Sequence, residues 1–180
     1  MNSNLTTIGE ISKIIISGGT PNTQNAAYWN GEFPWLSSGE TRNRFIESTE
    51  KTITQQGIDE SSTRLIHKNS IVIASAGQGN TRGQASFCLI DTYINQSIIG
   101  IEIDETIADP YYVFLNLSKR YQELRQISDS TSIRGSLTTK LVRNLTIVLP
   151  PLEVQRSVSS LIRSFDNLIS VNQKINDYLS

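Results

Sequence analysis

The last thirty residues of the chain, 150–180, carry the pattern that most restricts what the sequence can fold into. Two prolines end an apolar run, and beyond them apolar side chains recur at spacings that alternate between four and three residues. This alternation is typical of the a and d positions of a coiled coil. At a rise of about 1.5 Å per residue the predicted helix is roughly 39 Å long. The pattern occupies Val154, Val158, Leu161, Phe165, Leu168, Asn172, Ile175 and Leu179.

A helix with such a stripe can fold back on its own domain or pair with another helix. Ile162 and Ile169 widen the stripe, and Asn172 lies within it. These features favour pairing, because a buried polar residue at a seam position often fixes register and partner number. We expect no later segment to cover the stripe, and we interpret 150–180 as an assembly helix. The predicted dimerisation residues are Val158, Leu161, Phe165, Leu168, Asn172, Ile175 and Leu179.

Residues 1–149 are predicted to form one mixed, β-rich domain of the α+β class, since strands and helices follow one another without a βαβ rhythm. The clearest strand is 70–76, which is β-branched and bounded by turn residues. Further strands are expected at 51–54, 85–90, 96–103 and 145–149, short helix at 55–62, helix or strand at 5–16, and a short strand or packed turn at 33–36.

The main helix of the domain is predicted to begin at Asp109-Pro110, an N-cap acid followed by proline at the first helical position. Its expected apolar face is Phe114, Leu117, Tyr121 and Leu124.

Charge and composition set limits on partners and location. The net charge is −1, so the chain lacks the global basic signature of a nucleic-acid-binding protein. Six basic residues against two acidic ones between Lys119 and Arg143 nevertheless allow a local basic face. Neither a signal peptide nor a membrane-length apolar run is present, which predicts a cytoplasmic protein. The single cysteine, Cys88, is interpreted as a buried structural thiol.

The sequence lacks the patterns of common catalytic sites. Residues 77–83 begin like a dinucleotide-binding loop, but the third glycine comes one position late and no helical pattern follows. A zinc site needs three or four ligands, and His67 and Cys88 alone do not supply them. No acidic residue has lysine two positions later, which removes the usual metal-dependent nuclease signature. We therefore predict a non-catalytic chain that binds no metal or cofactor of its own.

Three polar loops remain as candidate binding elements. Asparagine and glutamine can pair with adenine and arginine with guanine, while hydroxyl groups and backbone amides hold phosphates. Each loop taken alone is more often only a loop, but their recurrence without catalytic groups favours DNA binding. Arg82 and Arg134 are the leading base-reading candidates. The full set is Arg42, Asn43, Arg44, Gln78, Asn80, Thr81, Arg82, Ser130, Thr131, Ser132 and Arg134.

Four short blocks, in this order along the chain, resemble the specificity subunits of type I restriction–modification systems. Gly18-Gly19-Thr20-Pro21 with Phe33-Pro34-Trp35-Leu36 resembles the opening of that family's target recognition domain. The runs 68–74 and 95–101 resemble its next two blocks. Leu149-Pro150-Pro151-Leu152-Glu153 is similar to the entry into its spacer helix.

The resemblance implies a DNA-reading module without an active site. Such a module positions methyltransferase subunits, which use S-adenosylmethionine to modify adenine N6, and a restriction and translocase subunit. A typical subunit of this family has two recognition domains and two spacer helices, whereas this sequence has one of each, divided at 149/150. We therefore expect a half-length form that homodimerises through its helix and recognises a split palindrome.

Two other interpretations stay open at this point. The chain can be the recognition domain cut from a larger methyltransferase or a combined restriction–methylation enzyme. A structural coiled-coil adaptor is a third possibility, but it would not need the polar loops.

Overall fold

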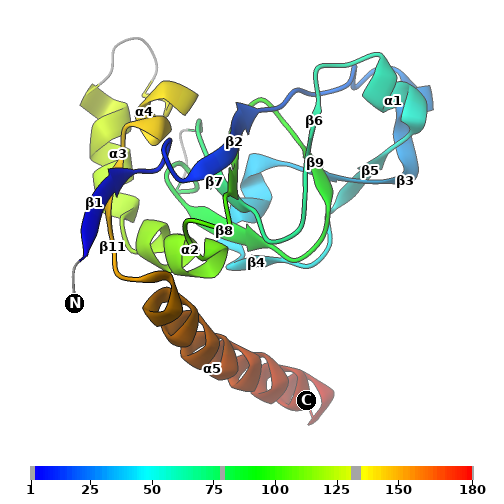
Figure 1. The fold of residues 1–180 in the computed structure, drawn as a ribbon. Coiled ribbons are helices and arrows are strands. Elements are labelled where there is room, and N and C mark those ends of the chain that lie inside the picture. Colours follow the sequence, from blue (N-terminus) through cyan, green and yellow to red (C-terminus); the bar gives the residue numbers. More distant parts are fainter. Residues whose placement is uncertain (1–2, 78–79, 131–134, 180) are drawn as a thin grey trace.

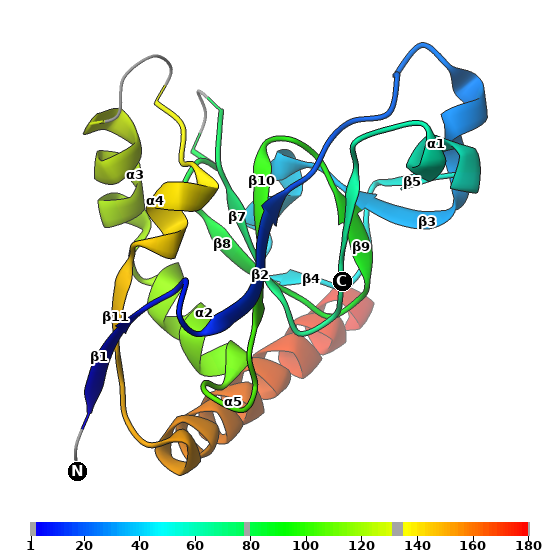
Figure 2. The same cartoon turned by 45° about the horizontal axis from the view of Figure 1, so that its top comes forward.

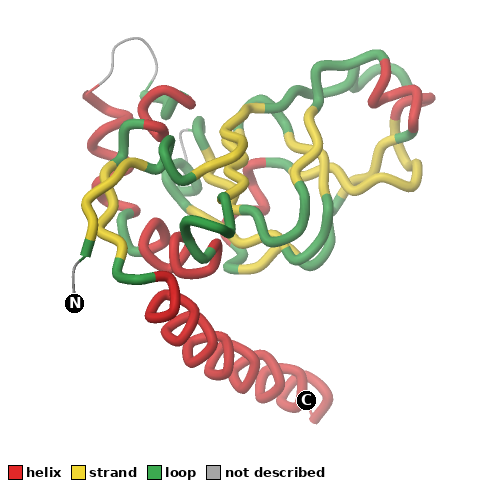
Figure 3. Tube along the Cα trace, viewed as in Figure 1, coloured by secondary structure: helices red, strands yellow, loops and turns green. Residues whose placement is uncertain are grey.

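Two mixed sheets, a layer of short helices and one long C-terminal helix make up the chain (Figure 1). The structure is a computed structural model, and it describes residues 3–77, 80–130 and 135–179. In Figure 3 the strands gather in the upper part of the molecule, while the long helix lies below them. The predicted α+β class with a C-terminal helix is confirmed.

The larger sheet has five strands in the order β2-β10-β7-β8-β4, and only β4 and β8 run parallel. The second sheet has the order β5-β3-β9-β6, with only β3 and β9 parallel. β1 and β11 form a separate antiparallel pair. The bounds are β1 Asn4–Thr7, β2 Ser12–Ser17, β3 Trp29–Leu36, β4 Phe45–Ile46, β5 Lys51–Ile53, β6 Arg64–Ile66, β7 Ile71–Ala74, β8 Ala85–Cys88, β9 Thr92–Ile94, β10 Ile98–Ile103 and β11 Thr146–Leu149.

Most of the helices cover one face of the larger sheet and the second sheet packs near its other face, although the helix 55–59 lies beside the second sheet (Figure 2). Their bounds are α1 Gln55–Asp59, α2 Pro110–Ser118, α3 Tyr121–Ser130, α4 Thr139–Arg143 and α5 Leu152–Leu179, with 3-10 helices η1 Ala26–Tyr28 and η2 Ser38–Arg42.

The central strand β7 divides the interior into two cores. Ile71 and Ile73 lie in the larger core with the helices, whereas Val72 lies in a smaller core with Leu36 and Ile66 of the second sheet. All four β7 side chains are buried, because successive side chains point to opposite faces and both faces are covered. The predicted strand at 70–76 is confirmed in the shorter strand β7, which is the middle strand of the larger sheet.

Gly100 permits the close approach of the second sheet to strand β10. A Cβ atom at this position would lie 2.4 Å from the Ile66 Cδ1 atom, closer than real Cβ atoms approach other atoms. Cys88 is fully buried beside this contact, and burial raises the pKa of its thiol to about 12. Its interpretation as a structural thiol agrees with this position.

The helix predicted at Asp109-Pro110 begins where expected, because the Asp109 side chain accepts a hydrogen bond of 2.8 Å from the Tyr112 N–H. The prediction that one helix continues to Leu124 is wrong. The chain turns after Ser118 and starts a second helix, α3, at Tyr121, with the Arg120 N–H bonded to the Leu117 carbonyl. Leu117 before the turn and Leu124 after it both lie in the larger core.

Three other expectations needed correction. The segment 5–16 forms two strands in different sheets, β1 and β2, rather than one element. Ser130, expected in a polar loop, is instead the last residue of α3. The short strands β4, β6 and β9 were not predicted, since each has two or three residues and shows too little pattern to be recognised.

Candidate nucleic-acid interface and assembly helix

The glycine-rich loop between β7 and β8 is held in shape by its own backbone. Gly77 and Gly83 have φ angles of +131° and +87°, a region that favours glycine. The Gly83 N–H donates to the Ala74 carbonyl at 2.9 Å, and the Gln84 N–H to the Thr81 carbonyl at 2.8 Å. Asn80 is exposed and Thr81 half-buried, while Gln78 lies outside the described residues. Asn80 thus presents its side chain to solvent next to a hydrogen-bonded turn.

The structure brings this loop beside the segment that follows α3. The Arg82 guanidinium donates to the Asp129 carboxylate and to the Gly135 carbonyl oxygen. The Tyr121 hydroxyl group donates to the Asn80 carbonyl at 2.9 Å. The described residues 80–82 of one candidate loop therefore lie beside Asp129 and Gly135, which flank the other.

The candidates at the two loops differ in exposure. The Arg82 side chain is only 11% exposed, so in this arrangement its guanidinium joins the two loops instead of facing solvent. Ser130 is exposed, and its hydroxyl group bonds to the Ile127 carbonyl. Thr131, Ser132 and Arg134 lie outside the described residues, so their assignment to DNA stays a prediction.

The third candidate loop, 41–44, connects η2 to β4. The Ser86 hydroxyl group lies within hydrogen-bond distance of the Thr41 and Asn43 carbonyl oxygens, at 3.0 and 2.6 Å, which anchors the loop backbone on β8. The Arg42 and Asn43 side chains are exposed, with an ion pair of 3.7 Å between Arg42 and Glu50. These two residues remain available for contact with a ligand.

A cleft of about 280 Å³ connects this loop with the glycine-rich loop. It lies between the loop 41–44, the start of β8 and the helices α2 and α3, and it is lined by Thr41, Arg42, Asn43, Arg44, Gln84, Ala85, Phe114, Ser118 and Tyr121. Gln84 Oε1 is buried and has no hydrogen-bond partner among the described residues. Gln84 and Tyr121 were not among the sequence candidates. Gln84 was overlooked because it lies at the end of the loop, just before the strand.

Intramolecular bonds occupy part of the predicted basic face. The Arg120 guanidinium donates to Glu123 at 2.7 Å and to the Thr146 carbonyl at 2.8 Å, and its ion pair holds the pKa of Glu123 below its ordinary value. Arg143 reaches the Ile15 carbonyl at 3.4 Å. Lys119 and Lys140 are exposed. The charge that this segment offers to a partner is therefore smaller than its composition indicates.

Helix α5 contacts the domain through a face that the sequence analysis did not single out. The Gln155 side chain accepts from the Asp109 N–H at 2.9 Å and donates to the Pro150 carbonyl at 2.8 Å. One turn later the Ser159 hydroxyl group donates to the Asp109 carboxylate. Gln155 and Ser159 are 1% and 3% exposed. This polar docking face ties α5 to the first turn of α2.

The docking face ends in a cluster of charged and aromatic groups around Asp166. The Arg44 guanidinium makes two bonds of 3.1 Å to the Asp166 carboxylate, and the Tyr111 hydroxyl group donates to the same carboxylate. The Arg163 guanidinium lies 4.1 Å from the centre of the Tyr111 ring. Burial, followed by the bond to Asp166, raises the pKa of Tyr111 to about 12, so its hydroxyl group keeps the donated proton. Arg44, a predicted DNA contact, is thus occupied in anchoring α5.

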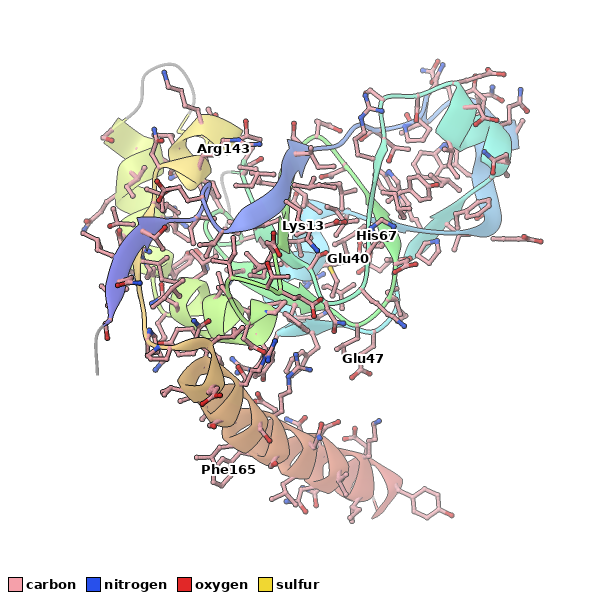
Figure 4. The ribbon with its side chains drawn as sticks, viewed as in Figure 1. Lys13, Glu40, Glu47, His67, Arg143 and Phe165 are labelled. Carbon is pink, nitrogen blue, oxygen red and sulfur yellow. The ribbon has the colours of Figure 1, made fainter. Side chains whose placement is uncertain are left out.

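The predicted seam lies on the opposite face of α5 and is exposed. The exposed fractions are 59% for Leu161, 54% for Phe165 and 60% for Leu168. Phe165 projects from the helix away from the domain (Figure 4). Val158, Ile169, Val171 and Ile175 are exposed as well, Asn172 lies among them, and the Leu179 side chain is outside the described part. Ile162, which was expected to widen the stripe, is half-buried and packs against the larger core, and Val154 at the start of the pattern is half-buried. The exposed part of the seam therefore does not fold back on its own domain, the first of the two interpretations of the helix.

Comparison with known proteins places the chain in a family. The family model described as type I restriction modification DNA specificity domain matches residues 2–180. The chain belongs to this family. The resemblance inferred from the sequence blocks is confirmed.

Relatives of the specificity domain include the type I restriction enzyme MjaIX specificity subunit of Methanocaldococcus jannaschii. It is 26% identical over 176 residues, which cover 96% of this chain and 39% of the relative. The EcoR124I/EcoR124II specificity subunit of Escherichia coli is 27% identical over 164 residues, which cover 90% of this chain and 40% of the relative. The chain thus spans about two fifths of the length of these relatives.

Solved structures show the same fold for the specificity domain. The HsdS subunit from Thermoanaerobacter tengcongensis matches with a TM-score of 0.70 and 14% identity, covering 96% of this chain and 39% of that one. A type I restriction–modification S subunit from M. genitalium matches with a TM-score of 0.70 and 16% identity. The match covers 96% of this chain and 41% of that one. Within residues 3–77, 80–130 and 135–179 the specificity domain has no group of three or more acidic, histidine or cysteine side chains arranged to hold a metal. None of its described helices is long and apolar enough to cross a membrane.

Proposed function

We propose that the chain is the DNA-reading specificity subunit of a type I restriction–modification system and works as a homodimer joined through α5. The observation that carries this proposal is the division of α5 into a polar docking face and an exposed apolar seam. Exposed apolar surface of this extent marks an interaction site. The family supports DNA as the target, and the exposed Arg42 and Asn43 beside the 280 Å³ cleft suit contact with it.

The seam spacing supports an antiparallel pair. When two copies of α5 run in opposite directions around a two-fold axis between Asp166 and Asn167, Val158 faces Ile175, Leu161 faces Asn172 and Phe165 faces Leu168. Each position finds a seam partner because the alternation of four and three reads the same in both directions. Two domains related by this axis read the same half-sequence on opposite strands. The recognised site is then a split palindrome with an unread spacer.

In this proposal the catalytic steps are carried out by partner subunits. The dimer positions adenine-N6 methyltransferase subunits, whose cofactor is S-adenosylmethionine, and a restriction subunit. The specificity subunit itself supplies DNA contacts through exposed polar side chains and holds no cofactor. Methyl transfer by the purified chain alone would contradict this division of labour.

The test is to co-express the chain with its type I methyltransferase subunit in a host that lacks adenine methylation. Sequencing that detects N6-methyladenine then reports the methylated motif. The proposal expects one split palindrome that disappears when the chain is omitted. Methylation that does not depend on the chain would reject the specificity role.

An asymmetric motif would reject the homodimer and favour the second candidate, that the chain is a recognition domain of a larger DNA methyltransferase or combined restriction–methylation enzyme. The observation that favours this candidate is that the chain covers only about two fifths of the length of its relatives.

The reading surface is tested in the same assay. Arg42→Ala removes an exposed guanidinium beside the cleft, and a bidentate arginine contact is worth about 1–3 kcal/mol of base discrimination. The expected result is a motif relaxed at one position in each half-site. Arg64→Ala is the matched control, since Arg64 is an exposed arginine on β6 of the second sheet. An unchanged motif in Arg42→Ala would remove Arg42 from the reading surface.

A further inference from the structure

The Asp166 cluster attaches the middle of α5 to the domain. Asp166 has 14% of its side chain exposed, and beyond it every α5 residue up to Tyr178 is exposed except Ser170. The first half of α5 is thus bound to its own domain, whereas the second half is mostly exposed and lines a cleft of about 650 Å³ together with residues 42–48 of the domain. The orientation of the domain around α5 depends on the bonds made at this point.

The cluster also connects α5 directly to the candidate reading loop. Arg44, which pairs with Asp166, is the next residue after Asn43 and follows Arg42 by two positions. Its guanidinium lies 5.1 Å from the centre of the Phe114 ring, so it is held between α2 and α5. The Arg44 carbonyl accepts the Phe87 N–H at 3.0 Å. A change in the Arg44–Asp166 pair therefore acts on the loop that carries Arg42 and Asn43.

The pair is built from directional bonds, not from apolar packing. Two parallel N–H···O bonds between a guanidinium and a carboxylate define both distance and angle. The Tyr111 hydroxyl group adds a third donor to the same carboxylate from α2. Three donors from two different elements leave the carboxylate one orientation, which apolar contacts alone would not specify.

We propose that Asp166, with Arg44 and Tyr111, is the positioning element that sets the spacer length read by the dimer. The proposal rests on the function given above. In the antiparallel pair the two Asp166 clusters lie next to the two-fold axis, and each fixes the angle at which its domain leaves the helices. Without the cluster each domain can rotate about its helix. Because both domains of the pair rotate, the two movements together change the distance between the reading surfaces.

The test measures spacer discrimination in the methylation assay with the co-expressed methyltransferase subunit. Plasmids carry the wild-type half-sites with spacers one base pair shorter, equal and one base pair longer. Asp166→Ala is expected to keep the half-site sequences and to lower the preference for the wild-type spacer about tenfold, the scale of one lost charge-assisted hydrogen bond. Asp166→Glu, which keeps the charge, is expected to recover part of the preference.

Two further variants keep the proposal open to rejection where Asp166→Ala fails to fold. Tyr111→Phe removes one donor and retains the ring, and Asp166→Asn retains the side-chain volume. Both should widen spacer use, whereas Asn167→Ala, an exposed neighbour of similar size, should not. Wild-type spacer preference in folded, dimeric Asp166→Asn and Tyr111→Phe would overturn the positioning role. A wild-type chain that directs no split motif would instead reject the proposed function itself.

Discussion

The two long faces of α5 differ in chemistry and in what they contact. The docking face carries Gln155, Ser159 and Asp166, which are buried or mostly buried and bonded to the domain. The seam carries Leu161, Phe165 and Leu168, each more than half exposed. An ordinary surface helix shows the reverse arrangement, with its apolar face toward the core. The proposed pairing of α5 with a second helix rests on this difference.

The arrangement also separates two structural tasks. Directional hydrogen bonds fix how the domain sits on the helix, because each bond requires a defined geometry. Apolar burial supplies most of the free energy of association but specifies angle less strictly. Changes to the seam should therefore affect assembly, and changes to the docking face should affect domain stability and geometry.

The largest effect is expected from Leu161→Lys combined with Leu168→Lys. Four lysines per pair are then buried in the seam, two opposite Asn172 and two opposite Phe165, which should raise the dissociation constant of the dimer at least about 100-fold, or about 3 kcal/mol. The domain should stay folded, because the seam does not contact it. Sedimentation velocity should show folded monomers, and directed methylation should be lost. Dimers of wild-type affinity in this variant would place the interface elsewhere.

The next effect is on the docking face. Asp166→Ala leaves the Arg44 guanidinium and the buried Tyr111 hydroxyl group without their acceptor, which should lower the free energy of unfolding by about 2 kcal/mol. Urea denaturation of monomeric Leu161→Lys/Leu168→Lys protein, with and without Asp166→Ala, measures this free-energy change separately from dimerisation. A change of less than about 0.5 kcal/mol would mean that the cluster adds no stability, which is typical of a surface substitution.

A smaller effect is expected at Ser159. Ser159→Ala removes the hydroxyl group that donates to Asp109, the N-cap residue of α2, and should cost about 1 kcal/mol. The control is Ser157→Ala, whose hydroxyl group bonds only within α5, to the Glu153 carbonyl, and which is exposed. Thermal unfolding of both variants in the same monomeric background compares them. Equal melting temperatures would contradict a structural role for the docking face.

The smallest effect is a pH dependence carried by Tyr111. The folded state raises the pKa of Tyr111 to about 12, above its ordinary value of 10.0, because burial and Asp166 both disfavour the phenolate. Its contribution to stability is thus complete below pH 10 and is lost as the pH rises toward 12. Between these values the free energy of unfolding should fall more steeply in the wild type than in Tyr111→Phe. Parallel pH profiles would show that Tyr111 titrates normally in the fold.

The sequence allowed much of the fold to be predicted, because its strongest signals are local. The β-branched strand 70–76, the Asp109-Pro110 cap and the alternating seam each depend on neighbours within a few residues. The docking face of α5 escaped prediction because it is polar, and hydrophobic periodicity records only apolar positions. Its partner Arg44 lies 122 residues from Asp166 in the sequence, so a basic residue in a polar loop was assigned to DNA.

The candidate site was predicted less completely, because its contacts join residues that lie far apart in the sequence. Arg82 and Asp129 are 47 residues apart, and only the fold shows that the arginine joins two loops. Apart from Arg44, which anchors α5, the exposed members of the set are Arg42, Asn43, Asn80 and Ser130, and their positions agree with the original hypothesis without testing it.

The central claim, that the exposed seam of α5 joins two copies, is tested most directly by sedimentation equilibrium of the wild-type chain at micromolar concentration. The account predicts a particle of twice the 20.1 kDa chain mass, reduced to the chain mass by Leu161→Lys with Leu168→Lys. A wild-type chain that remains a 20.1 kDa monomer at these concentrations would contradict it.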